Sequence, residues 1–171
     1  FFFQTPDGIF HGNDPVRGPW AENACHAGPV IGLVARAAEA LVPDKRMTRV
    51  SADLIRPVPL DGLMVEAEMK REGRLTASTS VRVSGLDGKV CVQANTLHIA
   101  ETDLGEVPTA AFPLPDMTEA TPGPFPVSET AHALPSFADF VDVRYPPGET
   151  PGPGPTTLWL RTPALLDGET P

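Results

Sequence analysis

The sequence predicts an α+β fold in which an antiparallel sheet wraps around a single central helix. One segment carries apolar residues every three or four positions, which is the spacing of a helix with one buried face. In four later segments apolar and polar residues alternate, which is the pattern of half-buried strands. Tight turns separate most of these segments, so neighbouring strands are expected to run antiparallel.

The predicted helix covers residues 29–41. It begins at Pro29, whose missing N–H costs nothing in the first turn of a helix, and Pro43 marks its end. Its apolar positions recur at helical spacing: Val30, Ile31, Val34, Ala37, Ala38 and Leu41. A helix with one such face is expected to pack against a sheet.

The predicted strands cover residues 47–55, 63–71, 74–84 and 89–99. Pro57 and Pro59 end the first strand because proline cannot donate a hydrogen bond within a sheet. Asp87 and Gly88 form a strong signal for a hairpin turn. The segments 1–4 and 9–11 are expected to add one short strand, which gives about five. Such a sheet, wrapped around one helix and solvated on its other face, is the hotdog fold.

Charge and proline content divide the chain near residue 100. Residues 1–100 hold 11 Lys/Arg, 11 Asp/Glu and 7 Pro, whereas residues 101–171 hold 2, 11 and 14. We therefore expect an N-terminal hotdog domain at 1–100 and a Pro-rich acidic linker at 101–138. The remainder, 139–171, is expected to hold the first strands of an incomplete second hotdog.

Two alternating segments, 137–145 and 157–162, provide the strands of this last part. A two-stranded hairpin is marginally stable by itself in water, so these strands must belong to a larger unit. The sequence thus predicts the N-terminal half of a double hotdog.

Composition argues against several classes of function. No run approaches the roughly 20 apolar residues of a transmembrane helix, and the first residues lack the basic segment of a signal peptide, so we expect a cytoplasmic protein without a membrane partner. The net charge of −9 and the lack of a basic run argue against nucleic acid. Cys25 and Cys91 form no CxxC pair, and no His, Asp or Glu set has metal-ligand spacing. No metal or other cofactor is expected.

The candidate site is the loop that leads into the helix. A helix N-terminus presents unpaired N–H groups and a partial positive charge, so the N–H groups near Gly28 can hold a carbonyl oxygen that becomes negative during acyl transfer. His26 can orient the substrate or act as a base, and Trp20 can line an apolar channel. Each also has a purely structural explanation, with His26 bonding a loop and Trp20 filling the core.

Two neighbouring candidates are weaker. Cys25 lies beside His26, but adjacent side chains rarely face each other, and no nucleophile-elbow motif surrounds it. Asp53, on the polar side of its strand, could act as an acid or base, although solvation or an ion pair with Arg49 explains it better.

Several short motifs resemble those of acyl-CoA thioesterase II-like proteins. Trp20, the helix entry His26-Ala27-Gly28-Pro29-Val30 and the run Arg56-Pro57-Val58-Pro59 are similar to the first hotdog of that family. Trp159-Leu160-Arg161 and Leu165-Leu166-Asp167-Gly168-Glu169 are similar to the opening of its second hotdog. The chain departs from the family at Ala27, which replaces the first glycine of a His-Gly-Gly motif and adds a β-carbon at the helix entry.

The resemblance implies an enzyme that hydrolyses acyl-CoA thioesters to free acid and CoA by means of an activated water. His26 and Gly28 would then be catalytic, and Trp20 and Ala27 would bind the substrate. The family's catalytic Asp, Gln and Thr/Ser lie on the second hotdog, beyond residue 171. The phosphates of coenzyme A could meet Arg17, Arg46 or Arg56.

Two other functions stay open. A catalytically silent acyl-binding hotdog is favoured by Ala27 and by the lack of a complete acid/base set. An enoyl-CoA hydratase would need an Asp near the helix entry, and none lies between Asn23 and Pro29. In every case the open edges of a hotdog sheet predict pairing with the second hotdog or with another copy, which is a homo-oligomer.

Overall fold

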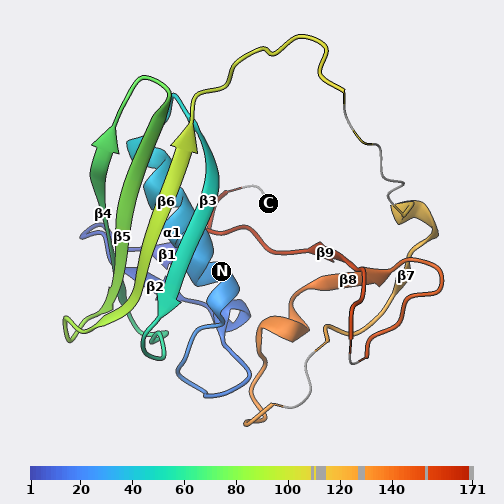
Figure 1. Cartoon of the computed structure of the whole chain (residues 1–171). Helices are drawn as coiled ribbons and strands as arrows, with labels where there is room; N and C mark the ends of the chain where they lie inside the picture. Colours follow the sequence, from blue (N-terminus) through green and yellow to red (C-terminus); the bar gives the residue numbers. More distant parts are fainter. Residues whose placement is uncertain (109, 111–114, 127–129, 153, 170–171) are drawn as a thin grey trace.

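Helix α1 (Ala27–Leu41) lies in the concave face of a six-stranded sheet in the computed structural model of the chain, which describes residues 1–108, 110, 115–126, 130–152 and 154–169 (Figure 1). The strands lie in the order β1 (Phe2–Gln4), β2 (Phe10–Gly12), β4 (Leu63–Glu72), β5 (Thr76–Gly85), β6 (Val90–Ile99) and β3 (Arg46–Leu54). All neighbouring pairs are antiparallel. This arrangement confirms the predicted hotdog fold and leaves β3 at one edge.

The N-terminal segment forms two strands instead of the single one predicted, so the sheet has six strands and not about five. A turn between them reverses the chain: the Thr5 N–H donates to the Ile9 carbonyl oxygen (2.9 Å), and the Gly8 N–H donates to that of Thr5 (2.9 Å). Gly8 adopts a φ of 88°, a region that favours glycine. The reversal pairs Phe3 with His11.

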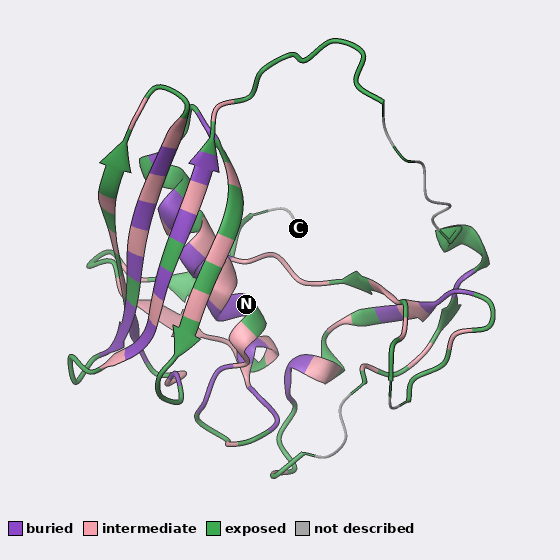
Figure 2. Ribbon diagram, in the orientation of Figure 1, coloured by how far each residue is buried: buried purple, intermediate pink, exposed green. Residues whose placement is uncertain are grey.

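The core lies between α1 and the concave face of the sheet. Alternate residues of β5 and β6 are buried, and Figure 2 shows them as purple bands along these two strands. Leu33 is buried although the predicted spacing omits it, whereas Leu41 is exposed in the last helical turn. On the outer face Arg82 and Glu66 form an exposed ion pair (3.2 Å), which confirms the prediction that this face is solvated.

A second, three-stranded antiparallel sheet follows in the order β7 (Thr121–Pro122), β8 (Asp142–Tyr145) and β9 (Trp159–Arg161). The strand predicted at 137–145 starts late, because Ser136 and Asp139 form a capping box that folds Phe137–Asp139 into a 3-10 helix. A 3-10 turn at Met117–Glu119 and β7 both lie within 101–138. The division of the chain at residues 100 and 138 stays a prediction.

The last described residues return to the first sheet. The N-terminal amino group of Phe1 donates to the Ala164 carbonyl oxygen (2.8 Å), the Phe2 N–H donates to that of Leu165 (3.0 Å), and Leu166 is buried in the hotdog core. The predicted strand at 157–162 is shorter, at Trp159–Arg161. None of the helices in the described ranges is long and apolar enough to cross a membrane.

Candidate functional site

The loop that leads into α1 is held by the backbone of its neighbours. The His26 N–H donates to the Val16 carbonyl oxygen (2.6 Å), and the Cys25 N–H donates to that of Val58 (2.7 Å). Ala24 forms a bridge to Pro59. The Arg-Pro-Val-Pro run therefore supports the helix entry through Ala24 and Cys25, and the Val16 carbonyl holds the backbone of His26.

His26 is the N-cap residue of α1. Its Nδ1 accepts a hydrogen bond from the Gly28 N–H at 3.2 Å, which explains why the helix begins at Ala27, two residues before the predicted start. An Nδ1 that accepts must be unprotonated, so the neutral ring carries its proton on Nε2. Burial lowers the pKa of His26 from its usual value of 6.5. Both effects keep His26 neutral.

Aromatic rings enclose the His26 imidazole. The Phe137 ring stacks on it at 4.1 Å between centroids and 4° between planes, and the Trp20 ring lies parallel to it at 5.8 Å. Phe125 meets it edge-on at 6.2 Å. Trp20 is 65% exposed, so it does not fill the core. The structure thus brings Trp20, His26 and Gly28 together, and their roles toward a substrate stay predictions.

An apolar pocket of about 490 Å³ opens beside Gly28 and Phe137, both of which contact His26. Its lining includes Phe1, Gly28, Pro29, Gly32, Phe137 and Leu165. Leu165 packs directly over Gly32, because a Cβ at this position would lie 2.9 Å from Leu165 Cδ1 and the leucine side chain would have to shift. The glycine therefore lets the returning C-terminal segment pass close to the helix, and that segment forms one wall of the pocket.

The structure also places the remaining candidate residues of the sequence analysis, Ala27, Asp53 and Cys25. Ala27 is the half-buried first residue of α1, and Asp53 is exposed on β3. Cys25 is buried, which raises the pKa of its thiol to about 12, so the thiol stays protonated and is a poor nucleophile. No ion pair joins Asp53 to Arg49 in the part of the chain that the structure describes, because residues four apart on one strand are too far from each other.

The three arginines considered for the phosphates of coenzyme A are engaged with the protein. Arg17 donates to the Glu22 and Pro135 carbonyl oxygens, both at 2.8 Å. Arg46 pairs with Glu101 at 3.0 Å, and Arg56 donates to the Val90 carbonyl oxygen at 2.7 Å. Of these, only Arg46 and Arg56 are exposed.

A buried polar network in the first sheet was not predicted. Thr79, Thr96 and His98 form a buried chain of hydrogen bonds on the concave face of the sheet, at 2.7 and 2.8 Å. The signal in the sequence was their position in the apolar phase of β5 and β6. Within the described ranges, no three His, Cys, Asp or Glu side chains gather as metal ligands.

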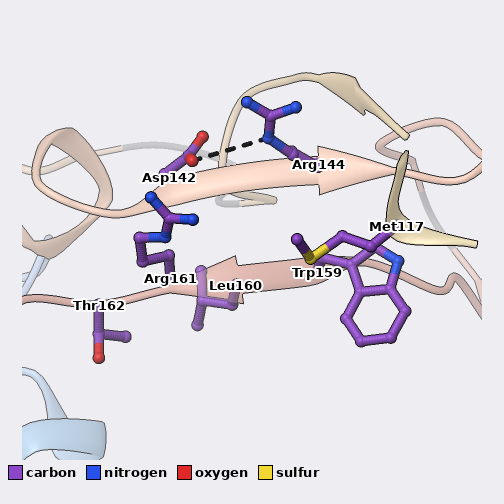
Figure 3. A pocket seen from close by; sticks show the side chains of 7 residues that line it. All are labelled: Met117, Asp142, Arg144, Trp159, Leu160, Arg161 and Thr162. Atoms are coloured by element: carbon purple, nitrogen blue, oxygen red, sulfur yellow. Dashed lines mark ion pairs between the residues drawn. The ribbon is translucent and has the colours of Figure 1, made fainter. Parts of the chain in front are cut away.

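A second pocket, of about 540 Å³, lies on the small sheet (Figure 3). Arg144, Trp159 and Arg161 line it together with Met117 and Asp142. Arg144 is paired with Asp142 at 3.7 Å. The indole Nε1 of Trp159 is buried without a hydrogen-bond partner among the described residues.

Acidification is expected to destabilise the chain through His26. Because the pKa of His26 is lowered in the folded state, its contribution to stability is complete above pH 6.5 and is lost as the pH falls through the lowered value. Thermal unfolding of the protein and of His26→Asn over a pH series measures this, since Asn keeps the N-cap without titrating. The wild type should lose stability relative to the variant below pH 6.5, and parallel curves would contradict the expectation.

Known proteins share this fold. The model of the acyl-CoA thioesterase N-terminal domain family matches residues 16–99. A Thermobifida fusca protein assigned as a thioesterase II superposes with a TM-score of 0.64 at 14% identity, over 87% of this chain and 53% of its own. A Novosphingobium aromaticivorans protein assigned as a thioesterase superposes with a TM-score of 0.68 at 20% identity, over 94% of this chain and 64% of its own.

A Streptococcus mutans protein bound to acetyl CoA superposes with a TM-score of 0.50 at 15% identity, over 59% of this chain and 89% of its own. No curated protein matches the chain. The chain spans less than two thirds of the length of the first two similar structures, and at these identities their similarity shows the fold. On the family match and the hotdog architecture together, residues 16–99 form an acyl-CoA thioesterase-like N-terminal domain.

Proposed function

We propose that this chain is the N-terminal half of a double-hotdog, cytoplasmic enzyme that hydrolyses acyl-CoA thioesters to free acid and CoA. The observation that carries the proposal is the neutral His26 at the N-terminus of α1, beside an apolar pocket that an acyl chain can fill. The match of residues 16–99 to the acyl-CoA thioesterase N-terminal domain family supports it. The acetyl CoA bound by the similar Streptococcus mutans protein indicates the substrate class.

In this proposal His26 holds the thioester carbonyl. The sequence assigned that task to N–H groups near Gly28, but the Gly28 N–H donates to His26 Nδ1 and therefore orients the ring instead. Among the described residues, Nε2 has no hydrogen-bond partner, so its N–H can donate to the carbonyl oxygen as negative charge develops there. Trp20 and Ala27 flank the bound thioester.

The chemical step itself requires a water. The water attacks the thioester carbon, the C–S bond breaks, and the sulfur leaves with a proton as the free thiol of CoA. The resemblance places the groups that activate this water, an Asp, a Gln and a Thr/Ser, in the second hotdog. No covalent intermediate on Cys25 is needed, and its raised thiol pKa disfavours one.

The assembly proposed for the enzyme uses the open edge of the sheet. β3 pairs only with β6, and its other side has no strand among the described residues. Leu54 and Ile55, at the end of this edge, are 53% and 52% exposed. We propose that β3 pairs with the second hotdog or with another copy of the chain, which would cover the edge.

A catalytically silent acyl-binding protein is the second candidate. One observation favours it: the Gly28 N–H, the best-placed backbone donor at the helix entry, is already engaged by His26. Such a protein would bind acyl-CoA and leave the thioester intact.

Incubation of the whole double-hotdog protein, with its second hotdog included, with CoA thioesters from acetyl to palmitoyl is expected to release free thiol. Thiol release is followed with a chromogenic disulfide, and binding is followed in parallel by calorimetry with each thioester. If the protein binds the thioesters but releases no thiol at any chain length, hydrolysis is rejected and the acyl-binding function is supported. Hydration of crotonyl-CoA without thiol release would instead indicate a hydratase.

A further inference from the structure

We propose that Phe137 is a positioning residue for His26, held in place by Arg17, so that the segment 131–137 is part of the site at the helix entry. The role of this segment in turnover rests on the proposed function. Its contact with the His26 ring does not, because that contact follows from the geometry alone.

The segment 131–137 crosses the loop that leads into α1. The Ala131 N–H donates to the Pro19 carbonyl oxygen at 2.7 Å, and the Phe137 N–H donates to that of Arg17 at 2.8 Å. Nε2 of His132 lies 3.0 Å from the Gly18 carbonyl oxygen. Figure 1 shows this orange segment beside the blue loop before α1. The segment is therefore bonded along its length to the residues that precede His26.

Arg17 holds the C-terminal end of the segment 131–137 by a hydrogen bond to Pro135. Its guanidinium donates to the Pro135 carbonyl oxygen (2.8 Å), to that of Glu22 (2.8 Å) and to the carboxylate of Asp14 (2.8 Å). The side chain of Arg17 is only 14% exposed, so most of its surface lies against the protein. One arginine thus ties the loop before α1 to the segment that carries Phe137.

The Phe137 ring is locked on its other sides as well. Phe1 stacks on it at 5.8 Å, and Phe125 meets it edge-on at 5.3 Å. The capping box of Ser136 and Asp139 fixes its backbone, with the Ser136 N–H donating to Asp139 Oδ2 at 2.8 Å. Phe137 is 5% exposed. Because the Phe137 ring is fixed by these contacts, it can keep the His26 ring stacked against it.

These contacts restrict His26 to one orientation. The Phe137 ring lies 4.1 Å from the imidazole and parallel to it, and the Gly28 N–H fixes Nδ1. A swing of the imidazole away from the cap would break both contacts. Nε2 is left as the nitrogen that can meet a substrate, and Phe137 itself continues into the apolar pocket. Phe137 therefore fixes the orientation of the His26 ring and excludes water from one face of that ring.

The test replaces the Phe137 ring by an aliphatic group of similar size. In Phe137→Leu the His26 ring gains water and mobility, so the pKa of His26, followed by NMR and assigned with His26→Asn, should rise toward its usual value. Turnover of the best acyl-CoA should fall about 10- to 100-fold with little change in KM, because the bound carbonyl meets a misaligned donor. Phe140→Leu is the matched control, since Phe140 lies three residues on and is 38% exposed.

Arg17→Gln tests the same contact from the other partner and is used if Phe137→Leu does not fold. It removes the bond to Pro135 and should raise the pKa of His26 in the same direction. An unchanged titration of His26 in the folded variants, or an equal change in Phe140→Leu, would overturn the inference. If the protein releases no thiol at all while the titration shifts as expected, the proposed function fails and the assignment of Phe137 stands.

Discussion

His26→Asn is expected to lower acyl-CoA hydrolysis about 100- to 1,000-fold, the usual effect of removing one donor to a developing oxyanion. The substitution removes the Nε2–H that would meet the thioester carbonyl. It keeps the N-cap, because the Asn side-chain oxygen can accept from the Gly28 N–H as His26 Nδ1 does. The fold should therefore survive, and the loss should be in turnover. Steady-state thiol release at several substrate concentrations measures it.

Two controls separate chemistry from folding. Asp53→Asn changes an exposed carboxyl on β3 and should leave hydrolysis unchanged. His26→Ala removes the ring and the cap together, so it should also cost about 1 kcal/mol of stability. The capping bond from the Gly28 N–H is the reason to expect this loss of stability. Unchanged turnover in His26→Asn, or equal losses in Asp53→Asn, would show that the site lies elsewhere.

The sequence predicted the elements whose signals are local. Alternation in β3, β4, β5 and β6 gave these strands to within two residues, since one face of each packs against α1 and the other meets water. The turn at Gly8 was missed because residues 1–11 are too short to show a period. The 3-10 helix at Phe137–Asp139 was read as a strand because a capping box depends on one backbone conformation at Ser136.

Part of the candidate site could likewise be predicted, because its residues are close together in the sequence. His26 and Gly28 are two residues apart, and a helix start brings such residues together. Phe137 and Leu165 reach the same place from more than a hundred residues away, through hydrogen bonds to Arg17 and Phe2 that no periodicity encodes. Gly32 leaves room for Leu165, but a glycine in a helix does not by itself indicate which distant residue packs on it.

Thr96→Val is expected to destabilise the chain by about 2–4 kcal/mol, although it changes the volume of the side chain little. Thr96 Oγ1 is the middle member of the buried chain, 2.7 Å from Thr79 Oγ1 and 2.8 Å from His98 Nε2. Both neighbours would lose their partner inside the core, where they are 1% and 0% exposed. His98 would then have two unpaired ring nitrogens, because Nδ1 already has no partner among the described residues.

The cost in Thr96→Val comes from the groups left unpaired and not from lost packing, and a double variant distinguishes the two. Thr79→Val with Thr96→Val removes both hydroxyls, so only His98 stays unpaired and part of the lost stability should return. Thr48→Val is the matched control, since Thr48 makes its hydrogen bond to the Leu97 carbonyl oxygen at the exposed edge (3.2 Å) and should change stability by less than about 0.5 kcal/mol. Urea unfolding of the three variants measures these differences. Equal losses of stability in Thr48→Val and Thr96→Val would mean that the buried chain contributes no more than an exposed hydrogen bond. Partial recovery of stability in the double variant would show that the cost comes from the unpaired Thr79 and His98 side chains.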